Sequence, residues 1–166
     1  MAAVVIADAS PLIALARVDG LGWLRALFGD VLVTTVVVQE VLTGDFPATE
    51  APIRSALAEG WLRPVEVTTD QPEFPDLDEG EAASLRLALA SPTQALVLID
   101  ERAGRAVAME LGLQVAGTAA VIGMARRRGL IPSARAIFEQ LHRSDFRIAP
   151  DIIRTVLQRC SELGPD

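Results

Sequence analysis

The chain of 166 residues lacks lysine and tyrosine, and it contains one histidine and one cysteine; all fifteen basic residues are arginine. Without lysine, a phosphate-binding loop built on a Gly-Lys pair and Schiff-base chemistry are both excluded. One histidine and one cysteine cannot assemble a zinc site from Cys and His ligands. The single cysteine, Cys160, also excludes an internal disulfide framework and fits a reducing cytosol.

Nucleophilic catalysis has few residues to draw on. A Ser-His-Asp triad would need His142 as its base, and His142 lies in a stretch that is typical of a helix end. Cys160 lies in "TVLQRCSEL", which is typical of a C-terminal helix. The side chains that remain for chemistry are carboxylates, hydroxyls and arginines.

Long apolar runs are missing as well. The longest candidate, residues 31–38, is interrupted by Thr34 and Thr35 and falls short of the roughly 18 residues of a membrane span. The first residues carry no basic segment, so we expect no signal peptide. The length of 166 residues predicts one domain, over residues 1–166 with a C-terminal helical extension at about 132–164, and the 51% of hydrophobic residues indicate that it is globular. Without a membrane span or a signal peptide, we expect the protein to be cytoplasmic and without membrane contact.

Strand-like and helix-like segments alternate along the chain. Strands are predicted at residues 3–7, 31–33, 95–99 and 114–116, with a weaker one at 61–67. Helices are predicted at 11–18, 21–28, 35–42, 49–59, 79–90, 101–111, 118–128, 133–142 and 151–163, and residues 68–80 are typical of an exposed loop. This alternation predicts an α/β protein: a three-layer α/β/α, Rossmann-like fold with a central, mostly parallel sheet and extra C-terminal helices.

Two of the predicted strands end in aspartate. "VVIAD" ends in Asp8 and "LVLID" ends in Asp100, and ligands of parallel sheets bind beyond the carboxyl ends of the strands. Ser10 and Pro11 already form a helix start, which leaves Asp8 without a structural role. For Asp100 the alternative is that it caps the helix expected to begin at Glu101.

Two glutamates join these aspartates as candidates. Glu40 lies on the same helix face as Val36, and a buried carboxylate needs a partner. The alternative is that Glu40 reaches solvent at the helix end or pairs with an arginine. Glu81 aligns with Leu85 on an apolar stripe, and its alternative is a capping box in which Asp78 is the N-cap.

If the four carboxylates Asp8, Glu40, Glu81 and Asp100 converge, protons or a metal must neutralise them. Oxygen ligands without histidine favour Mg²⁺ or Mn²⁺, which commonly serve phosphoryl chemistry. These four residues are therefore the candidate metal ligands and catalytic residues. The hydroxyls of Ser10 and Thr118 are candidates for a supporting role, as further ligands or as holders of metal-bound water.

Four segments occur in a characteristic order: "VVIADASPLIALARVDGL", "FGDVLVTTVVVQEVL", "LDEGEAASLRLALA" and "ALVLIDERAGRAVAMELGLQVAGTAAVIGMARRRGLIPS". Together they resemble a PIN-domain protein over nearly the whole chain, and more narrowly a prokaryotic subgroup related to VapC-type toxins. The resemblance implies an acidic Mg²⁺/Mn²⁺ centre formed by Asp8, Glu40, Glu81 and Asp100, with Ser10 beside Asp8. It implies an endoribonuclease that cleaves single-stranded or structured RNA. Many relatives are toxins of type II toxin–antitoxin pairs, which adds an antitoxin partner and a homodimer to the expectations.

One segment departs from the family pattern. Many PIN nucleases have a threonine at the end of the fourth strand, an Asn or Asp two positions on, and a later Asp-Phe. Here Asp100 itself ends the strand, and the segment "ERAGR" that follows contains no Asp-Phe.

The charge balance limits how RNA can bind. A net charge of −7 opposes the binding of a polyanion, and few aromatics are available to stack on bases. Arg102 and Arg105 are candidate phosphate contacts, as is the triplet at 126–128, whose alternative is a solvated helix end. We therefore expect a selective or weak nuclease.

Other function classes remain as alternatives. A haloacid-dehalogenase-type phosphatase and a receiver domain both require a lysine that this chain lacks. The main alternative is a catalytically weak or inactive PIN-like module that binds a protein or RNA partner.

Overall fold

Strands and helices alternate in the structure, a computed structural model that describes residues 3–162. In chain order the elements are β1 (Val4–Ala7), α1 (Ala9–Arg17), α2 (Gly22–Phe28), β2 (Val31–Thr34), α3 (Thr35–Val41), α4 (Pro47–Glu59), β3 (Leu62–Val65), α5 (Glu79–Ala90), β4 (Ala95–Leu98), α6 (Arg102–Glu110), β5 (Gln114–Ala116), α7 (Thr118–Arg127), α8 (Ala134–Arg143) and α9 (Pro150–Arg159).

The five strands form one sheet in the order β3-β2-β1-β4-β5, and every pairing is parallel. The first strand, β1, therefore lies in the centre. Ala7 of β1 is opposite Leu98 of β4, and the N–H of Asp8 donates to the Leu98 carbonyl at 2.9 Å. The carboxyl ends of β1 and β4 are thus neighbours, as the sequence predicted, and the sheet is entirely rather than mostly parallel.

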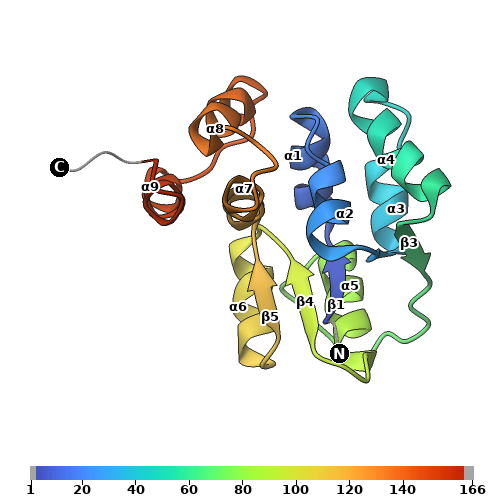
Figure 1. Cartoon of the computed structure of the whole chain (residues 1–166). Helices are drawn as coiled ribbons and strands as arrows, with labels where there is room; N and C mark the ends of the chain where they lie inside the picture. The colour runs from blue at the N-terminus through green and yellow to red at the C-terminus, as the bar shows by residue number, and fades with distance from the viewer. Residues whose placement is uncertain (1–2, 163–166) are drawn as a thin grey trace.

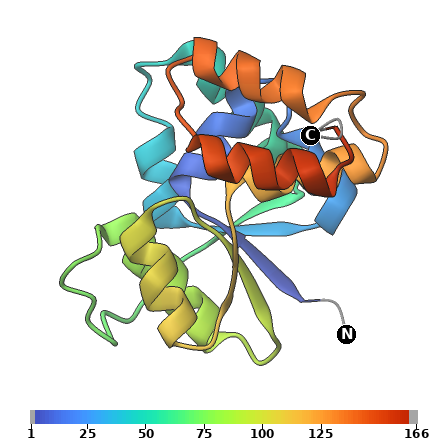
Figure 2. The same cartoon turned by 90° about the vertical axis from the view of Figure 1, so that its left-hand side faces the viewer.

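Successive strand residues face opposite sides of the sheet and pack into two separate clusters. Val5 and Ala7 belong to the larger cluster, whereas Ile6 packs with Val97 and Ile99 in the smaller one. Figures 1 and 2 show α5 and α6 on one face of the sheet and α1, α2 and α7 on the other. The sheet and its two helical layers form the three-layer α/β/α architecture that the alternation predicted.

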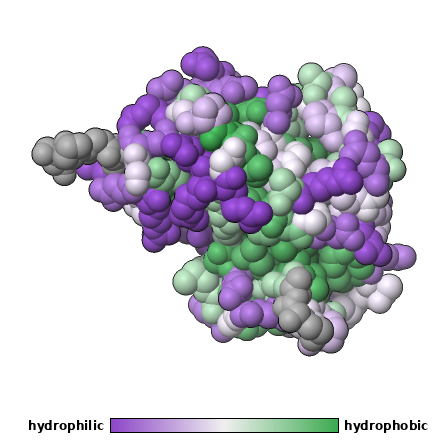
Figure 3. Space-filling model, in the orientation of Figure 1, coloured by the Kyte–Doolittle hydropathy of each residue, from purple (hydrophilic) through white to green (hydrophobic). Residues whose placement is uncertain are grey.

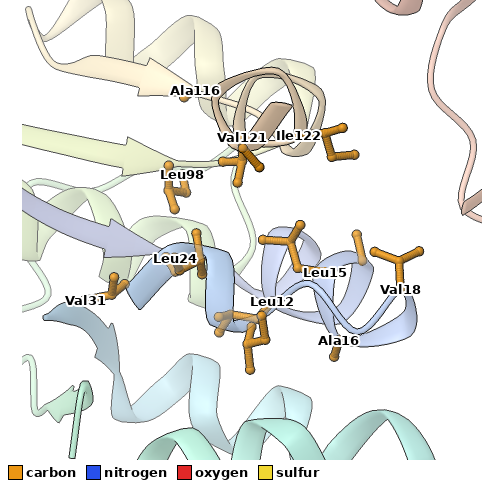
Figure 4. Packing of buried hydrophobic residues seen from close by; sticks show 14 of the residues in the cluster. Leu12, Leu15, Ala16, Val18, Leu24, Val31, Leu98, Ala116, Val121 and Ile122 are labelled. Atoms are coloured by element: carbon orange, nitrogen blue, oxygen red, sulfur yellow. The ribbon is translucent and has the colours of Figure 1, made fainter. Parts of the chain in front are cut away.

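The larger cluster joins α7 to the first two helices. Figure 4 shows Leu98 and Val121 pointing toward Leu15 and Leu24, and all four side chains are fully buried. Burying side chains of this size contributes about 1.5–3 kcal/mol each. This packing holds in place α1, the helix that begins at the residue after Asp8.

The extra C-terminal helices α8 and α9 pack on α7, as Figure 2 shows. The Glu162 carboxylate links them: it accepts from the Ser133 hydroxyl at 2.9 Å and from the Ala134 N–H at 2.6 Å, and it lies 3.5 Å from Arg126. Burial alone raises the pKa of Glu162, but the N–H and O–H donors and the Arg126 charge hold it below its ordinary value.

Several helices begin or end at other residues than predicted. The prediction that Ser10 caps the first helix was wrong, because α1 begins at Ala9 and Ser10 lies in its first turn. Asp8 occupies the N-cap position in extended conformation, although its side chain makes no capping hydrogen bond. α4 begins two residues earlier than predicted, at Pro47, whose fixed φ suits a first helical position. α9 ends at Arg159, so the predicted helix was wrong over residues 160–162, and residue 163 lies outside the described residues.

Residues 68–78 contain no helix or strand and are mostly exposed, which confirms most of the predicted loop; Glu79 and Gly80 already belong to α5. None of the helices found in residues 3–162 is long and apolar enough to cross a membrane. On the face in Figure 3, apolar side chains gather over the strand-bearing half and hydrophilic ones over the region of α8 and α9.

Candidate functional site

Three of the four predicted carboxylates lie near one another at the carboxyl edge of the sheet. Asp8 directly follows β1, Glu40 lies in the last turn of α3, and Glu81 lies in the first turn of α5. α3 and α5 pack against each other beside β1, which brings Glu40 toward Asp8 and Glu81. A fourth carboxylate, Asp78, stands at the N-cap of α5. We call Asp8, Glu40, Asp78 and Glu81 the acidic cluster.

Asp8 is the most enclosed member of the cluster, with 4% of its surface exposed. Burial, together with the nearby Asp78 and Glu40 charges, raises its pKa from the usual 3.8 to about 7, although hydrogen bonds from the Ala9 N–H and the Ser84 hydroxyl lower it. The Ser84 hydroxyl lies 3.5 Å from Asp8 Oδ1, but its shorter hydrogen bond, at 2.9 Å, goes to the Gly80 carbonyl. Asp8 is therefore held near the boundary between its two protonation states at neutral pH.

Asp78 and Glu81 combine a helix cap with membership in the cluster. Asp78 Oδ1 accepts from the Glu81 N–H at 2.8 Å, which confirms Asp78 as the N-cap in the alternative reading of this segment. Glu81 is nevertheless 6% exposed, and burial, followed by the Asp78 and Asp8 charges, raises its pKa to about 7. The sequence interpretation treated Asp78 only as a cap and missed its place in the cluster. The spacing of three residues between Asp78 and Glu81 at a helix start was the sequence signal that could have identified Asp78 as a member.

Glu40 reaches solvent at the end of α3, as one alternative expected, and none of the ion pairs among residues 3–162 joins it to an arginine. Partial burial raises its pKa, and so do the charges of Asp78 and Glu79, while a hydrogen bond from the Gly80 backbone N–H lowers it. Its partners therefore come from the first turn of α5.

Two glycines leave room for the cluster. A Cβ on Gly80 would overlap the Glu40 carboxylate, and a Cβ on Gly104 would stand 3.2 Å from Glu81 Oε2. Gly80 also has ordinary helical backbone within α5, where glycine is otherwise unfavourable. The close approach of α3 to α5 therefore accounts for glycine at position 80.

Among the described residues, the cluster has no cationic neighbour. The charged groups that shift the pKa values of Asp8, Glu40 and Glu81 are all carboxylates, and the ion pairs within residues 3–162 include none of the three. Two like charges 4 Å apart repel by about 4 kcal/mol at an effective dielectric of 20. Protons or a bound cation must therefore compensate the cluster.

The donor chemistry fits Mg²⁺ or Mn²⁺, because every group is a carboxylate oxygen with uncompensated charge. The side-chain arrangement is not a preformed coordination cage: across residues 3–162, no three acidic, histidine or cysteine side chains lie close enough to hold one ion together. Binding a metal here requires side-chain movement, for which the exposed Glu40 is the best placed member.

Asp100 lies at the same edge but has partners of its own. Its two oxygens accept from the N–H and the hydroxyl of Thr118, both at 2.7 Å. The alternative in which Asp100 caps the helix after β4 was wrong, because its carboxylate instead binds the first N–H of α7, at Thr118, whereas α6 has Glu101 at its N-cap. Burial raises the pKa of Asp100, whereas the two Thr118 bonds and the Arg105 charge lower it. A Cβ on Gly117 would stand 2.9 Å from Asp100 Oδ1, so glycine is needed there for this contact.

The remaining candidates are placed as follows. The Thr118 hydroxyl is fully buried and used by Asp100, and Ser10 is half-buried in the first turn of α1. Arg105 is half-buried and donates to the Ile99 carbonyl at 3.2 Å, while Arg102 is exposed at the start of α6. His142 lies in the last turn of α8, as its sequence context indicated.

Comparison with known proteins gives one match. A protein-family model, DUF3368, described as a PIN domain, matches residues 4–162. No curated protein and no solved structure matches the chain.

Proposed function

Because the chain belongs to the PIN-domain family, whose members are generally nucleases, we propose that it is a Mg²⁺- or Mn²⁺-dependent endoribonuclease that hydrolyses RNA phosphodiester bonds at the acidic cluster. The observation that carries the proposal is the set of enclosed carboxylates without a cationic partner at the carboxyl edge of a parallel sheet. Such a cluster costs stability unless a cation occupies it, which makes it a functional-site candidate.

In this proposal Asp8, Glu40 and Glu81 hold the metal, and Asp100 adds a fourth carboxylate from the neighbouring strand end. Ser10 and Thr118 support them, Thr118 by orienting Asp100 through its two 2.7 Å bonds. A bound Mg²⁺ or Mn²⁺ would activate a water and stabilise charge on the phosphate.

Arginines would contact the substrate phosphates. Arg102 is exposed beside the end of β4, whereas Arg105 is engaged by the Ile99 carbonyl and the Asp100 charge. Arg102 is therefore the stronger candidate of the two.

The same proposal includes the role of toxin in a type II toxin–antitoxin pair, an antitoxin partner and a homodimer, which rest on the resemblance of the sequence to a prokaryotic PIN subgroup related to VapC-type toxins. A second candidate function is a PIN-like module that binds a protein or RNA without turnover. The lack of three converging metal donors within residues 3–162 favours that second function.

The first test is thermal melting of the metal-free protein and of Asp8→Asn, each with and without millimolar Mn²⁺. A ligand at 100 times its Kd adds about 2.7 kcal/mol, which is several degrees for a chain of this size. We expect this gain in the wild type and its loss in Asp8→Asn. Asp70→Asn, an exposed acid of the 68–78 loop, is the matched control and should respond like the wild type.

Turnover is measured on the same proteins with single-stranded RNA. We expect cleavage that needs Mn²⁺ and falls at least 100-fold in Asp8→Asn. A melting response without cleavage, or RNA binding that survives Asp8→Asn without cleavage, would favour the non-catalytic module.

A further inference from the structure

A small cavity adjoins the acidic cluster. It has a volume of about 160 Å³ and lies between α1 and the segment that connects α3 to α4. Its lining includes Ile13 and Arg17 of α1, Glu40 and Val41 of α3, and Phe46 and Thr49. Glu40 belongs both to this lining and to the acidic cluster, so a ligand in the cavity lies directly beside the proposed reaction site.

Phe46 is the most unusual residue of this lining. Its surface is 63% exposed, and it is the one exposed aromatic side chain among the five phenylalanines and two tryptophans of the chain. Leaving a phenyl ring in water forgoes the free energy of its burial. The ring is therefore available for stacking with a ligand at the mouth of the cavity.

The backbone beneath Phe46 is held in place by a buried carboxylate. Glu50 is 2% exposed, and its two oxygens accept from the Gly44 N–H at 2.8 Å and from the Phe46 N–H at 2.7 Å. These bonds lower the pKa of Glu50, so it stays ionised and keeps both N–H groups bound at neutral pH. The backbone that carries the ring is thus held in place, so no backbone order has to be gained when a ligand binds.

Polar groups complete the cavity. Arg17 donates from Nη1 to the Ser144 carbonyl at 3.0 Å, which anchors its guanidinium while other N–H donors remain on it. The carboxylates of Glu40 and Asp45 lie in the same lining and repel a phosphate. The volume is well below the roughly 300 Å³ of cavities for larger ligands, so it admits one ring system.

From these contacts we infer that the cavity binds one nucleobase of the RNA substrate, stacked on Phe46, next to the bond that is cleaved. An aromatic face, donors on Arg17 and the Thr49 hydroxyl, and acceptors on Asp45 match the faces and edges of a base. The inference rests on the proposed nuclease function and adds to it a residue that determines which position of the RNA is cut.

The test combines protein variants with RNA oligonucleotides in which single bases are replaced by abasic sites along the cleaved sequence. In the wild type we expect one abasic position beside the cleaved bond to lower kcat/KM by about 10- to 100-fold, the range for one base stacked on an aromatic side chain. Phe46→Ala should lose a similar factor on the intact RNA. The same abasic site should then cause no further loss in Phe46→Ala.

Two control variants separate stacking from bulk changes. Phe46→Trp keeps an aromatic face and should retain near wild-type kcat/KM. Met109→Ala removes a side chain that is 64% exposed on α6, and it should behave as wild type with every RNA. Melting curves of each variant establish that the fold is retained.

Three results would overturn the inference. If the wild type cleaves RNA and Phe46→Ala matches Met109→Ala, only the base-binding role fails. Losses from Phe46→Ala and from the abasic site that multiply independently would also reject it. If the wild type cleaves no RNA with Mn²⁺, the nuclease function fails and the inference fails with it.

Discussion

Asp8 combines two conditions that oppose each other in a folded protein: it is enclosed and it lies among other carboxylates. Because its pKa is about 7 in the folded state and near 3.8 when unfolded, the folded state binds a proton that the unfolded state has released. The contribution of the protonated Asp8 to the free energy of unfolding is therefore complete below about pH 4 and is lost as the pH rises toward 7. One pKa unit corresponds to about 1.4 kcal/mol, so the loss amounts to several kcal/mol.

The corresponding prediction concerns Asp8→Asn in the absence of metal. The asparagine cannot ionise, so its melting temperature should exceed that of the wild type by a margin that grows from pH 4 to about 7 and then levels off. Melting curves in chelator at several pH values measure this margin. Asp70→Asn should show no such trend, and a margin independent of pH for Asp8→Asn would contradict the assignment of the raised pKa.

At the scale of elements, the contact between α3 and α5 sets the position of Glu40. Any residue other than glycine at position 80 would push the Glu40 carboxylate away, because its Cβ would overlap that carboxylate. Alanine is otherwise preferred to glycine within a helix by about 1 kcal/mol. The two effects have opposite signs and can be separated.

We therefore predict that Gly80→Ala destabilises the protein when Glu40 is present and stabilises it by up to about 1 kcal/mol in a Glu40→Ala background. Denaturant unfolding of the two single variants and the double variant gives the coupling free energy. The control is Gly22→Ala on α2, where a Cβ meets no atom and no coupling to Glu40 is expected. Additive effects of Gly80→Ala and Glu40→Ala would show that the two residues do not meet.

The sequence was a good guide to elements and a weaker one to their ends. The apolar runs and the aspartates that close them located β1 and β4, since buried parallel strands are apolar on both faces. The start of α1 was misplaced because Ser10 and Pro11 fit a helix start equally well in the first turn. The partners of Asp100 were not predictable, since Thr118 meets it only through the pairing of β4 with β5.

At the scale of the whole molecule, charge is unevenly distributed along the chain. Residues 126–162 contain eight arginines and four acidic residues, whereas residues 1–125 contain seven arginines and seventeen acids. Arg126 is paired with Glu162, but Arg127 and Arg128 are exposed at the end of α7. A polyanion therefore meets attraction at the C-terminal helices although the net charge is −7.

We predict that the double variant Arg127→Ala, Arg128→Ala weakens RNA binding and lowers the slope of log Kd against log salt by about 1 per lost phosphate contact. Fluorescence anisotropy with a labelled single-stranded RNA over a salt series measures both quantities. Arg25→Ala with Arg63→Ala removes the same charge from two exposed ion pairs and should leave the slope unchanged. Equal losses in the two double variants would show that only net charge matters.

The central position of β1 also determines when the sheet and the acidic cluster can form during synthesis of the chain. The ribosome makes β1 first, yet one of its two neighbours, β4, follows some 90 residues later, and Asp8 has no acceptor for its N–H until Leu98 has emerged. The carboxylates of α5 likewise join Asp8 only after the middle of the chain has been translated. A nascent chain thus carries Asp8 without the strand and helix that complete the acidic cluster until more than half of the chain has been translated.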